Sequence, residues 1–282
     1  MLYLIIALLG AFVIYSFLIE PRWVQVTRLE VYLKRLPPAF DGFKILHLTD
    51  LHTQRWGWRE RFVTDWVARQ SADIVAVTGD VMVYPFQGAD VTRLMVSLNH
   101  RLPVWFVLGN HDVRENPHLP DLLQEWRAQG IRILRNSHER LERNGAAIYL
   151  IGVDDPHLWM DDLKKALRGV PADACKILLA HSADIWEEAV RSGVDLILSG
   201  HTHGGQVRLP LLGALIANTR KIPRAYAAGL FDLTDHTQLF VNRGLGHSTL
   251  PLRFLCRPQV AIVTLRKEKP GTGKSGRRPA AS

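Results

Sequence analysis

From residue 43 onward, the chain alternates short apolar runs with longer amphipathic segments, the pattern of β-strands separated by α-helices. The runs expected to form strands are residues 44–48, 74–78, 104–108, 147–153, 176–180 and 196–199. The segments expected to form helices are residues 59–70, 90–99, 120–128, 160–167 and 185–192. Shorter β-like pieces at 226–231, 238–242 and 259–265 are expected to complete a second sheet. The sequence therefore predicts an α/β sandwich.

Five of the expected strands end in a cluster of Asp, His, Asn and Gly residues. The reactive residues of these clusters are, in chain order, Asp50, His52, Asp80, Asn110, His111, Asp112, His181, His201 and His203. Because ligands bind at the carboxyl ends of strands in open α/β sheets, we expect the five clusters to converge on one site. Carboxylate, imidazole and amide groups without a thiolate suit Mn, Fe or Zn, whereas a structural zinc site would normally use cysteine.

Two of these clusters have the spacing of ligand pairs. In Asp50-x-His52 and His201-x-His203, the i and i+2 side chains of an extended segment point the same way, so each pair can reach one region. Two neighbouring cations need a bridging group, and the carboxylate of Asp80 is the central candidate. Each piece alone has an ordinary explanation as a loop ion pair, a turn or a helix cap. The ordered set, in which every piece follows a strand-like run, is what indicates a site.

This ordered set resembles the calcineurin-like metallophosphoesterase family over residues 44–265. The resemblance implies a four-layer α/β/β/α sandwich that binds two divalent metal ions, Mn²⁺ first with Fe or Zn as alternatives, and hydrolyses phosphoesters with metal-activated water. It implies that one ion is bound by Asp50, His52 and His203 and the other by Asn110, His181 and His201, with Asp80 as the bridge. It also implies that His111 faces the substrate and assists the leaving group, while Asp112 fixes the tautomer of His111.

The first nineteen residues contain no charged side chain, and at about 1.5 Å per residue they reach roughly the thickness of a bilayer core. No Lys or Arg precedes the stretch and no small-x-small cleavage site follows it, so an uncleaved transmembrane anchor over residues 1–20 is favoured over a signal peptide or a buried core helix. Arg22, Arg28, Lys34 and Arg35 follow the stretch. The positive-inside rule then predicts that the catalytic domain lies in the cytoplasm.

The rest of the chain divides into three expected parts: a juxtamembrane segment over residues 21–42, a catalytic domain over 43–266 and a solvated basic tail over 267–282. The net charge of +8 comes from 35 Lys and Arg against 27 Asp and Glu, and residues 266–282 alone hold six basic residues and one acidic. The folded part is therefore only mildly basic, and no nucleic-acid binding is expected. The two cysteines fit neither a zinc ribbon nor a disulfide framework.

The apolar start, the motif at 200–206 and the ending at 243–258 look like the membrane-associated bacterial subgroup of that family, which includes hydrolases of UDP-2,3-diacylglucosamine, the nucleotide-linked precursor of lipid A. The resemblance therefore implies a location at the bacterial inner membrane and a lipid-linked or other phosphorylated small-molecule substrate, with membrane lipid as a partner. A phosphodiesterase for a soluble nucleotide is the alternative, and a catalytically silent scaffold is a third reading. The apolar segment 209–216 could face acyl chains or the bilayer, but packing in the core as a strand or hairpin is favoured.

Some further residues have weaker signals. Basic residues available for phosphate oxygens are Arg208, Lys221, Arg224, Arg243 and Arg253. His157 and His247 are the two histidines outside the clusters that could lie near the cleft, and the remaining ones are expected to be packed or on the surface.

Overall fold

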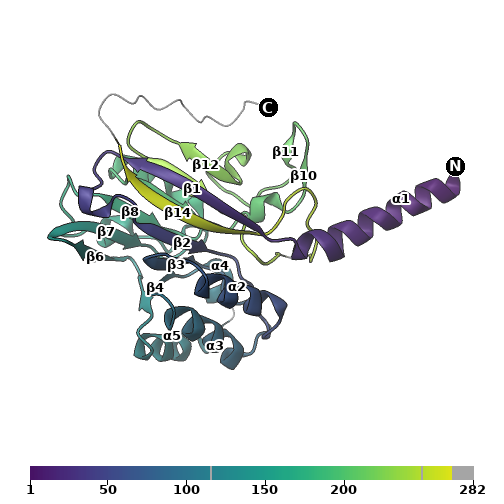
Figure 1. Cartoon of the computed structure of the whole chain (residues 1–282), viewed down its shortest axis with the longest axis horizontal. Helices are drawn as coiled ribbons and strands as arrows, with labels where there is room; N and C mark the ends of the chain where they lie inside the picture. Colours follow the sequence, from purple (N-terminus) through teal and green to yellow (C-terminus); the bar gives the residue numbers. More distant parts are fainter. Residues whose placement is uncertain (115, 249, 269–282) are drawn as a thin grey trace.

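The computed structural model of the protein describes residues 1–114, 116–248 and 250–268, and two six-stranded sheets face each other at its centre (Figure 1). The first sheet has the order β1 (Gln25–Leu33), β14 (Gln259–Lys267), β2 (Lys44–Leu48), β3 (Ile74–Thr78), β4 (Val104–Val107), β5 (Arg132–Ile133). The second has the order β12 (Gly229–Asp232), β13 (Gln238–Val241), β9 (Leu196–Ser199), β8 (Lys176–Leu179), β7 (Ala146–Gly152), β6 (Ser137–Arg143). A small antiparallel ribbon is formed by β10 (Arg208–Leu209) and β11 (Gly213–Ala214).

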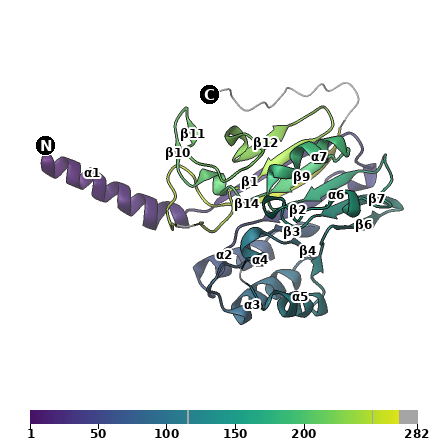
Figure 2. The same ribbon diagram turned by 180° about the vertical axis from the view of Figure 1, so that it is seen from behind.

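Helices cover the outer faces of both sheets (Figures 1 and 2). The first sheet is covered by α2 (Trp58–Ala68), α3 (Gly88–Asn99) and α5 (Leu119–Ala128), and the second by α6 (Leu163–Ala166) and α7 (Trp186–Arg191). The short helices are α4 (Asn110–Val113), η3 (Pro38–Phe40), η4 (Pro156–Leu158), η5 (Ala183–Ile185), η6 (His203–Gly205) and η7 (Arg224–Tyr226). The predicted four-layer α/β/β/α sandwich is therefore confirmed.

The central strands read as unbroken apolar runs because both of their faces are covered. Parallel pairing joins β2 to β3 and β3 to β4 in one sheet, and β7 to β8 and β8 to β9 in the other. Between the sheets, Ile45 and Ile74 belong to the same buried apolar cluster as Ile177 and Leu198. Such two-sided burial is typical of parallel sheets and explains why these strands were predicted to within about two residues of their ends.

The last strand differs from the expectation in its place. Residues 259–265 were expected to complete the second sheet, but β14 lies in the first sheet, antiparallel to β2. It pairs in parallel with β1 over nine residues, from Gln25 opposite Gln259 to Leu33 opposite Lys267. The segment 21–42 thus contributes a strand to the sandwich, a role that its sequence did not indicate. Of the expected basic tail, residues 269–282 lie outside the described residues.

An apolar helix projects from the sandwich (Figures 1 and 2). It runs from α1 (Leu2–Ile14) through a π-helical turn (Tyr15–Ile19) to a 3-10 turn (Glu20–Arg22) and is long and apolar enough to cross a membrane. Its lower end is fixed to the domain, because the buried carboxylate of Glu20 accepts hydrogen bonds from the backbone N–H of Leu255 at 2.8 Å and of Cys256. The helix and the sandwich are therefore joined by specific contacts.

Candidate metal centre

The carboxyl ends of five strands bring the expected clusters together. Asp50 and His52 follow β2, Asp80 follows β3, and Asn110 and His111 open α4 just after β4. From the second sheet, His181 follows β8, and His201 and His203 follow β9. All of these side chains except that of His111 are buried. The convergence expected from strand topology is thus present in the structure.

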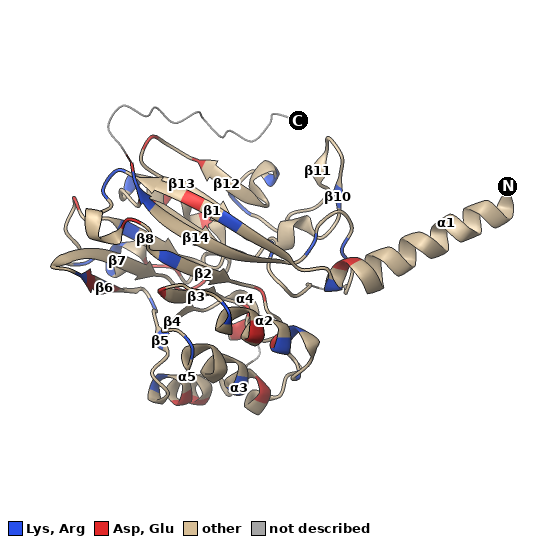
Figure 3. Cartoon of the chain, in the orientation of Figure 1, with Lys and Arg blue, Asp and Glu red and all other residues tan. Residues whose placement is uncertain are grey.

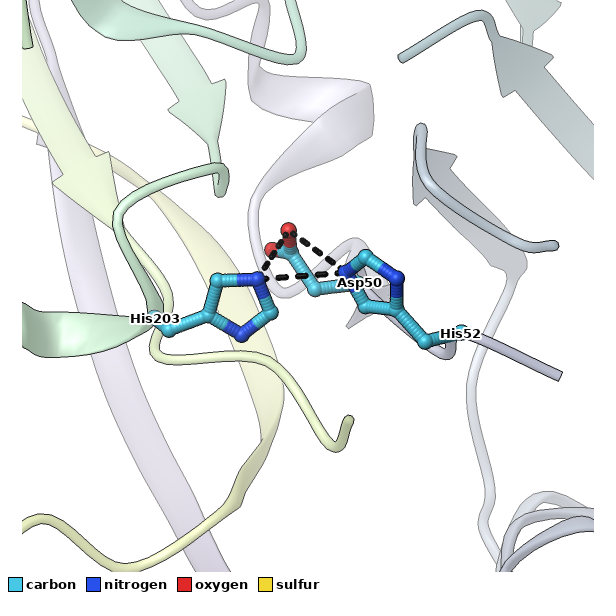
Figure 4. A group of neighbouring side chains, drawn as sticks. All are labelled: Asp50, His52 and His203. Carbon is cyan, nitrogen blue, oxygen red and sulfur yellow. Dashed lines mark hydrogen bonds and ion pairs between the residues drawn. The ribbon is translucent and has the colours of Figure 1, made fainter. Parts of the chain in front are cut away.

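The first group consists of Asp50, His52 and His203, whose ligand atoms face one another (Figure 4). The Nε2 atoms of the two histidines lie 3.1 Å apart, and Asp50 Oδ1 lies 3.4 Å from His203 Nε2 and 3.9 Å from His52 Nε2. The other carboxylate oxygen, Oδ2, accepts hydrogen bonds from the Thr49 hydroxyl and the His201 backbone N–H, both at 2.9 Å. These bonds leave Oδ1 directed at the two imidazoles.

The second group consists of Asp80, His181 and His201. His181 Nδ1 lies 2.8 Å from the carbonyl oxygen of Thr78, and because a carbonyl only accepts hydrogen bonds, Nδ1 carries the proton. When the His181 ring is neutral, its Nε2 atom therefore carries a lone pair. This atom lies 3.1 Å from His201 Nδ1 and 3.2 Å from Asp80 Oδ2. This convergence of nitrogen and oxygen lone pairs is what a cation would stabilise.

Asp80 connects the two groups. Its Oδ2 atom lies 3.2 Å from His181 Nε2 in the second group and 3.6 Å from His52 Nε2 in the first. Its Oδ1 atom accepts a hydrogen bond of 2.8 Å from the backbone N–H of His111. This is the position that the bridging interpretation requires of Asp80.

The side-chain oxygen of Asn110 supports a ligand role by its lack of a partner. Among the described residues, the buried Oδ1 atoms of Asn110 and Asp50 receive no hydrogen bond, although a buried acceptor left unpaired costs about 1–3 kcal/mol. Two divalent cations, one beside each of these residues, would satisfy the two oxygens. The donor set of carboxylate, amide and imidazole groups, with no thiolate, therefore fits hard or borderline metal ions.

The protonation of the histidines also suits a metal centre. Burial lowers the pKa of His52 to about 3 and takes the pKa of His201 and His203 well below the usual value, so these rings are neutral at pH 7 with a lone pair free. For His181, burial lowers the pKa, but the attraction of Asp80 outweighs it and the pKa rises well above its usual value. The carboxylate of Asp80 therefore favours positive charge at His181 Nε2, a position that a cation could take in place of the proton.

Backbone strain marks the same residues. Asp50, His52, Asp80, His201 and His203 all have positive φ angles, between 46° and 70°. For residues with a side chain this left-handed conformation costs roughly 1–2 kcal/mol each. Strain of this kind persists where the surrounding structure fixes it, and it gathers at functional sites.

Comparison with known proteins agrees with this geometry. Residues 43–205 match the calcineurin-like phosphoesterase family. The chain belongs to this family. It is 31% identical to the metallophosphoesterase YkuE of Bacillus subtilis, with 89% of each chain covered, and 30% identical to the phosphodiesterase YaeI of Escherichia coli, with 87% of this chain and 90% of YaeI covered. A transmembrane protein with a metallophosphoesterase domain from Danio rerio is 27% identical, covering 86% of this chain and 57% of that protein.

Membership of this family makes the chain a metal-dependent phosphoesterase, with the His and Asp groups as its divalent metal centre. His111 lies at the rim of that centre and is only partly buried. Its ring centroid is 4.9 Å from that of His52, in an edge-on arrangement. One of its ring nitrogens lies within 4.8 Å of ligand atoms of His52 and Asp80. His111 is thus the member of the predicted set that is not fully buried.

Asp112 has contacts of a different kind from those expected. Both of its oxygens accept hydrogen bonds from backbone N–H groups, those of Asp80, Val81, Met82 and Gly109, at 2.7 to 3.2 Å. This buried carboxylate therefore ties the loop after β3 to the loop after β4 in the phosphoesterase. That role fixes the position of Asp80, rather than the tautomer of His111.

Two residues near the phosphoesterase site, His157 and Arg253, lie outside the five sequence motifs, and both are buried. His157 is buried against the second group, with its ring centroid 4.4 Å from that of His201. Arg253, a candidate for phosphate binding, is also buried, and it donates to the backbone carbonyls of Cys256 at 3.1 Å and Arg243 at 2.9 Å. Arg253 thus holds the loop over residues 243–257, and its guanidinium is engaged within the protein.

This loop contacts the first metal group directly. The backbone N–H of Gly246 donates to the carbonyl oxygen of Asp50 at 2.6 Å. A side chain at Gly246 would lie only 2.7 Å from that oxygen and 2.8 Å from His52 Cβ, so the close approach requires glycine. The position of Asp50 and His52 therefore depends on a loop that also contacts the N-terminal helix.

Proposed function

We propose that this phosphoesterase hydrolyses a phosphodiester or pyrophosphate bond in a lipid-linked substrate at the membrane, with UDP-2,3-diacylglucosamine as the chemical type. The observation that carries the proposal is a cavity of about 120 Å³ between the N-terminal helix and the loop that contacts Asp50. It is lined by Phe17 and Arg22 from the helix end, by Arg59 of α2, and by Gly246 and His247 from the loop beside the first metal group. A substrate with its acyl chains beside the helix would present its phosphates near the metal ligands.

The site residues would have two roles in this reaction, metal binding and proton donation. Asp50, His52 and His203 would hold one divalent ion, Asn110, His181 and His201 the other, and Asp80 would bridge. Such a pair of ions polarises phosphoryl oxygens and makes a bound water nucleophilic at neutral pH. His111, partly exposed at the rim of the site, would donate a proton to the oxygen that leaves.

A soluble nucleotide is the alternative substrate, and a second cleft favours it. This cleft of about 460 Å³ is lined by Arg55, Trp58, Arg59 and Phe86, among others, and offers aromatic faces and cations to a base and its phosphates. A catalytically silent scaffold is disfavoured because it would have no use for buried, unpaired ligand atoms in two adjacent groups.

Activity on a panel of substrates distinguishes these three hypotheses. We expect the full-length protein with Mn²⁺ to hydrolyse bis-p-nitrophenyl phosphate, and to hydrolyse UDP-2,3-diacylglucosamine with kcat/KM at least about tenfold above that for free nucleotides, a difference of about 1.4 kcal/mol. A chelator should abolish both activities and added Mn²⁺ should restore them. Full activity in protein verified as metal-free would overturn the mechanism, and faster cleavage of nucleotides would support the alternative substrate.

The proposed location is the bacterial inner membrane with the catalytic domain in the cytoplasm. The Leu2–Arg22 helix is long and apolar enough to cross a membrane, and nearly all of it is exposed. We therefore expect the protein to stay with the membrane after carbonate washing, and a reporter fused after Ser282 to read as cytoplasmic. Release by carbonate, or a mature chain that starts after residue 19, would show that the helix is not an anchor.

A further inference from the structure

The apolar segment over residues 209–216 is exposed, contrary to the expectation that it packs in the core. Leu211 is 92% exposed, Ile216 is 77% exposed and Leu212 is 57% exposed. Two leucines of the loop between β13 and β14 are also exposed, Leu250 at 55% and Leu255 at 46%. These five residues are called the apolar collar below. Large exposed apolar groups gathered in one region indicate a binding surface.

The apolar collar lies beside the N-terminal helix through a continuous series of contacts. The ring of Phe254 is 5.0 Å from the ring of Phe12 and 6.1 Å from that of Tyr15. The carbonyl of Phe254 accepts a hydrogen bond of 2.9 Å from the N–H of Arg208, where β10 begins. Leu255 lines one cleft, of about 620 Å³, together with Leu211. Figures 1 and 2 both show the β10–β11 ribbon next to the base of the helix.

The helix contacts of the catalytic domain lie within the stretch that is long enough to cross a membrane. A helix of 21 residues is about 30 Å long, which matches a hydrocarbon core of roughly 30 Å. Phe12 and Tyr15 precede Arg22 and belong to the apolar stretch of this helix. The catalytic domain already contacts the helix at Phe12 and Tyr15. A helix that spans the bilayer therefore brings the 250–255 loop and the β10–β11 ribbon down to the lipid.

The charge pattern agrees with an interface. Figure 3 shows no charged side chain along α1, and the segment 209–216 contains none. Cations border both, with Arg22 at the helix end and Arg208 and Arg224 lining the cleft behind the ribbon. Arg257 stacks on Trp23 at 4.1 Å, a pair of the kind found at headgroup level. Acyl chains would accept the leucines, and phosphate groups would accept the arginines.

We propose that the apolar collar rests on the same leaflet from which the N-terminal helix emerges, with its side chains at the headgroup–acyl boundary. The backbone of the ribbon stays at headgroup level, because irregular backbone facing the hydrocarbon would leave N–H and C=O groups unpaired. The catalytic domain is then held against the bilayer at two points, the helix and the collar. This inference rests on the proposed membrane anchoring.

Site-specific fluorescent labels test the contact in the full chain. Cys175 and Cys256 are buried, so a cysteine introduced at an exposed position reacts selectively. We would label Leu211→Cys and Ile216→Cys with an environment-sensitive dye in vesicles of phosphatidylethanolamine and phosphatidylglycerol that contain a lipid with a nitroxide near the headgroup end of its acyl chain. Glu142→Cys, on β6 at the opposite end of the molecule, is the matched control (Figure 1). Ile6→Cys in α1 reports on the anchor itself.

We expect the nitroxide to quench the dyes at 211 and 216 several-fold more than the dye at 142, with blue-shifted emission at both collar positions. Quenching at Ile6 with none at either collar position would overturn the collar and leave the anchor intact. No quenching at any of the three would overturn the anchor and, with it, the collar. The two proposals therefore fail in different, recognisable ways.

Discussion

Replacing Asp80 by asparagine should abolish most activity and release metal from both halves of the site. The Oδ2 atom of Asp80 lies 3.6 Å from His52 Nε2 and 3.2 Å from His181 Nε2, so one substitution removes the charge that both groups share. We expect kcat/KM to fall by at least about 10³-fold, since loss of an outer-sphere partner alone typically costs 10–100-fold. Elemental analysis of the purified variant should find fewer than two ions per chain.

The control for this experiment is a second buried carboxylate. Asp195 precedes β9 and accepts hydrogen bonds of 2.8 Å from Arg35 Nε and the N–H of Lys176, at the other end of that strand from His201. Asp195→Asn tests the loss of a buried charge without touching the metal groups, and its metal content should be unchanged. Two tightly held ions in a folded Asp80→Asn protein would contradict the bridging role.

The sandwich and its site were predictable where the signal is local. Each of β2, β3, β8 and β9 is a short apolar run buried on both faces, and a polar cluster follows each run directly. Parallel pairing brings the carboxyl ends together, so the order of runs and clusters alone predicts convergence. Geometry adds what spacing does not contain, such as the single oxygen of Asp80 that faces both groups.

The edge of the first sheet was not predictable in the same way. β1 has an interrupted burial pattern, with only Val31 and Leu33 fully buried, because one face of this edge strand is open to solvent. Its partner, β14, lies more than 200 residues later in the chain. Pairing at that separation depends on tertiary contacts, and no local pattern distinguishes one sheet from the other for residues 259–265.

The role of Asp112 and the exposure of the 209–216 segment have a common lesson. Asp112 was expected to orient His111, and the 209–216 segment was expected to pack in the core, but in neither case is the actual partner encoded in a local motif. Asp112 contacts four backbone N–H groups, which no side-chain motif can indicate. Leu211 is exposed because the two-residue strands of its ribbon leave the tip outside both sheets.

Replacing His111 by alanine should lower kcat by about 10² to 10⁴ while both ions remain bound, the usual range for the loss of general acid–base help. The substitution is selective because only the backbone N–H of His111 bonds to Asp80 Oδ1, and alanine keeps that N–H. Stopped-flow or steady-state rates would be compared with metal content in the same preparation. His236→Ala, at an exposed turn, serves as the matched histidine control.

A comparison of substrates with different leaving groups tests whether His111 is a proton donor. A proton donor matters most when the departing oxygen is strongly basic, so the loss should be large for an alkyl phosphodiester and small for a nitrophenyl ester. Equal losses for both substrates would mean that the ring stabilises phosphoryl charge or positions the substrate. Loss of metal would mean that His111 is a ligand. Its position allows this outcome, because one of its ring nitrogens lies within 4.8 Å of ligand atoms of His52 and Asp80. Each result thus points to a different role for His111. Proton donation depends on the basicity of the leaving group, charge stabilisation does not, and metal binding changes the metal content of the variant.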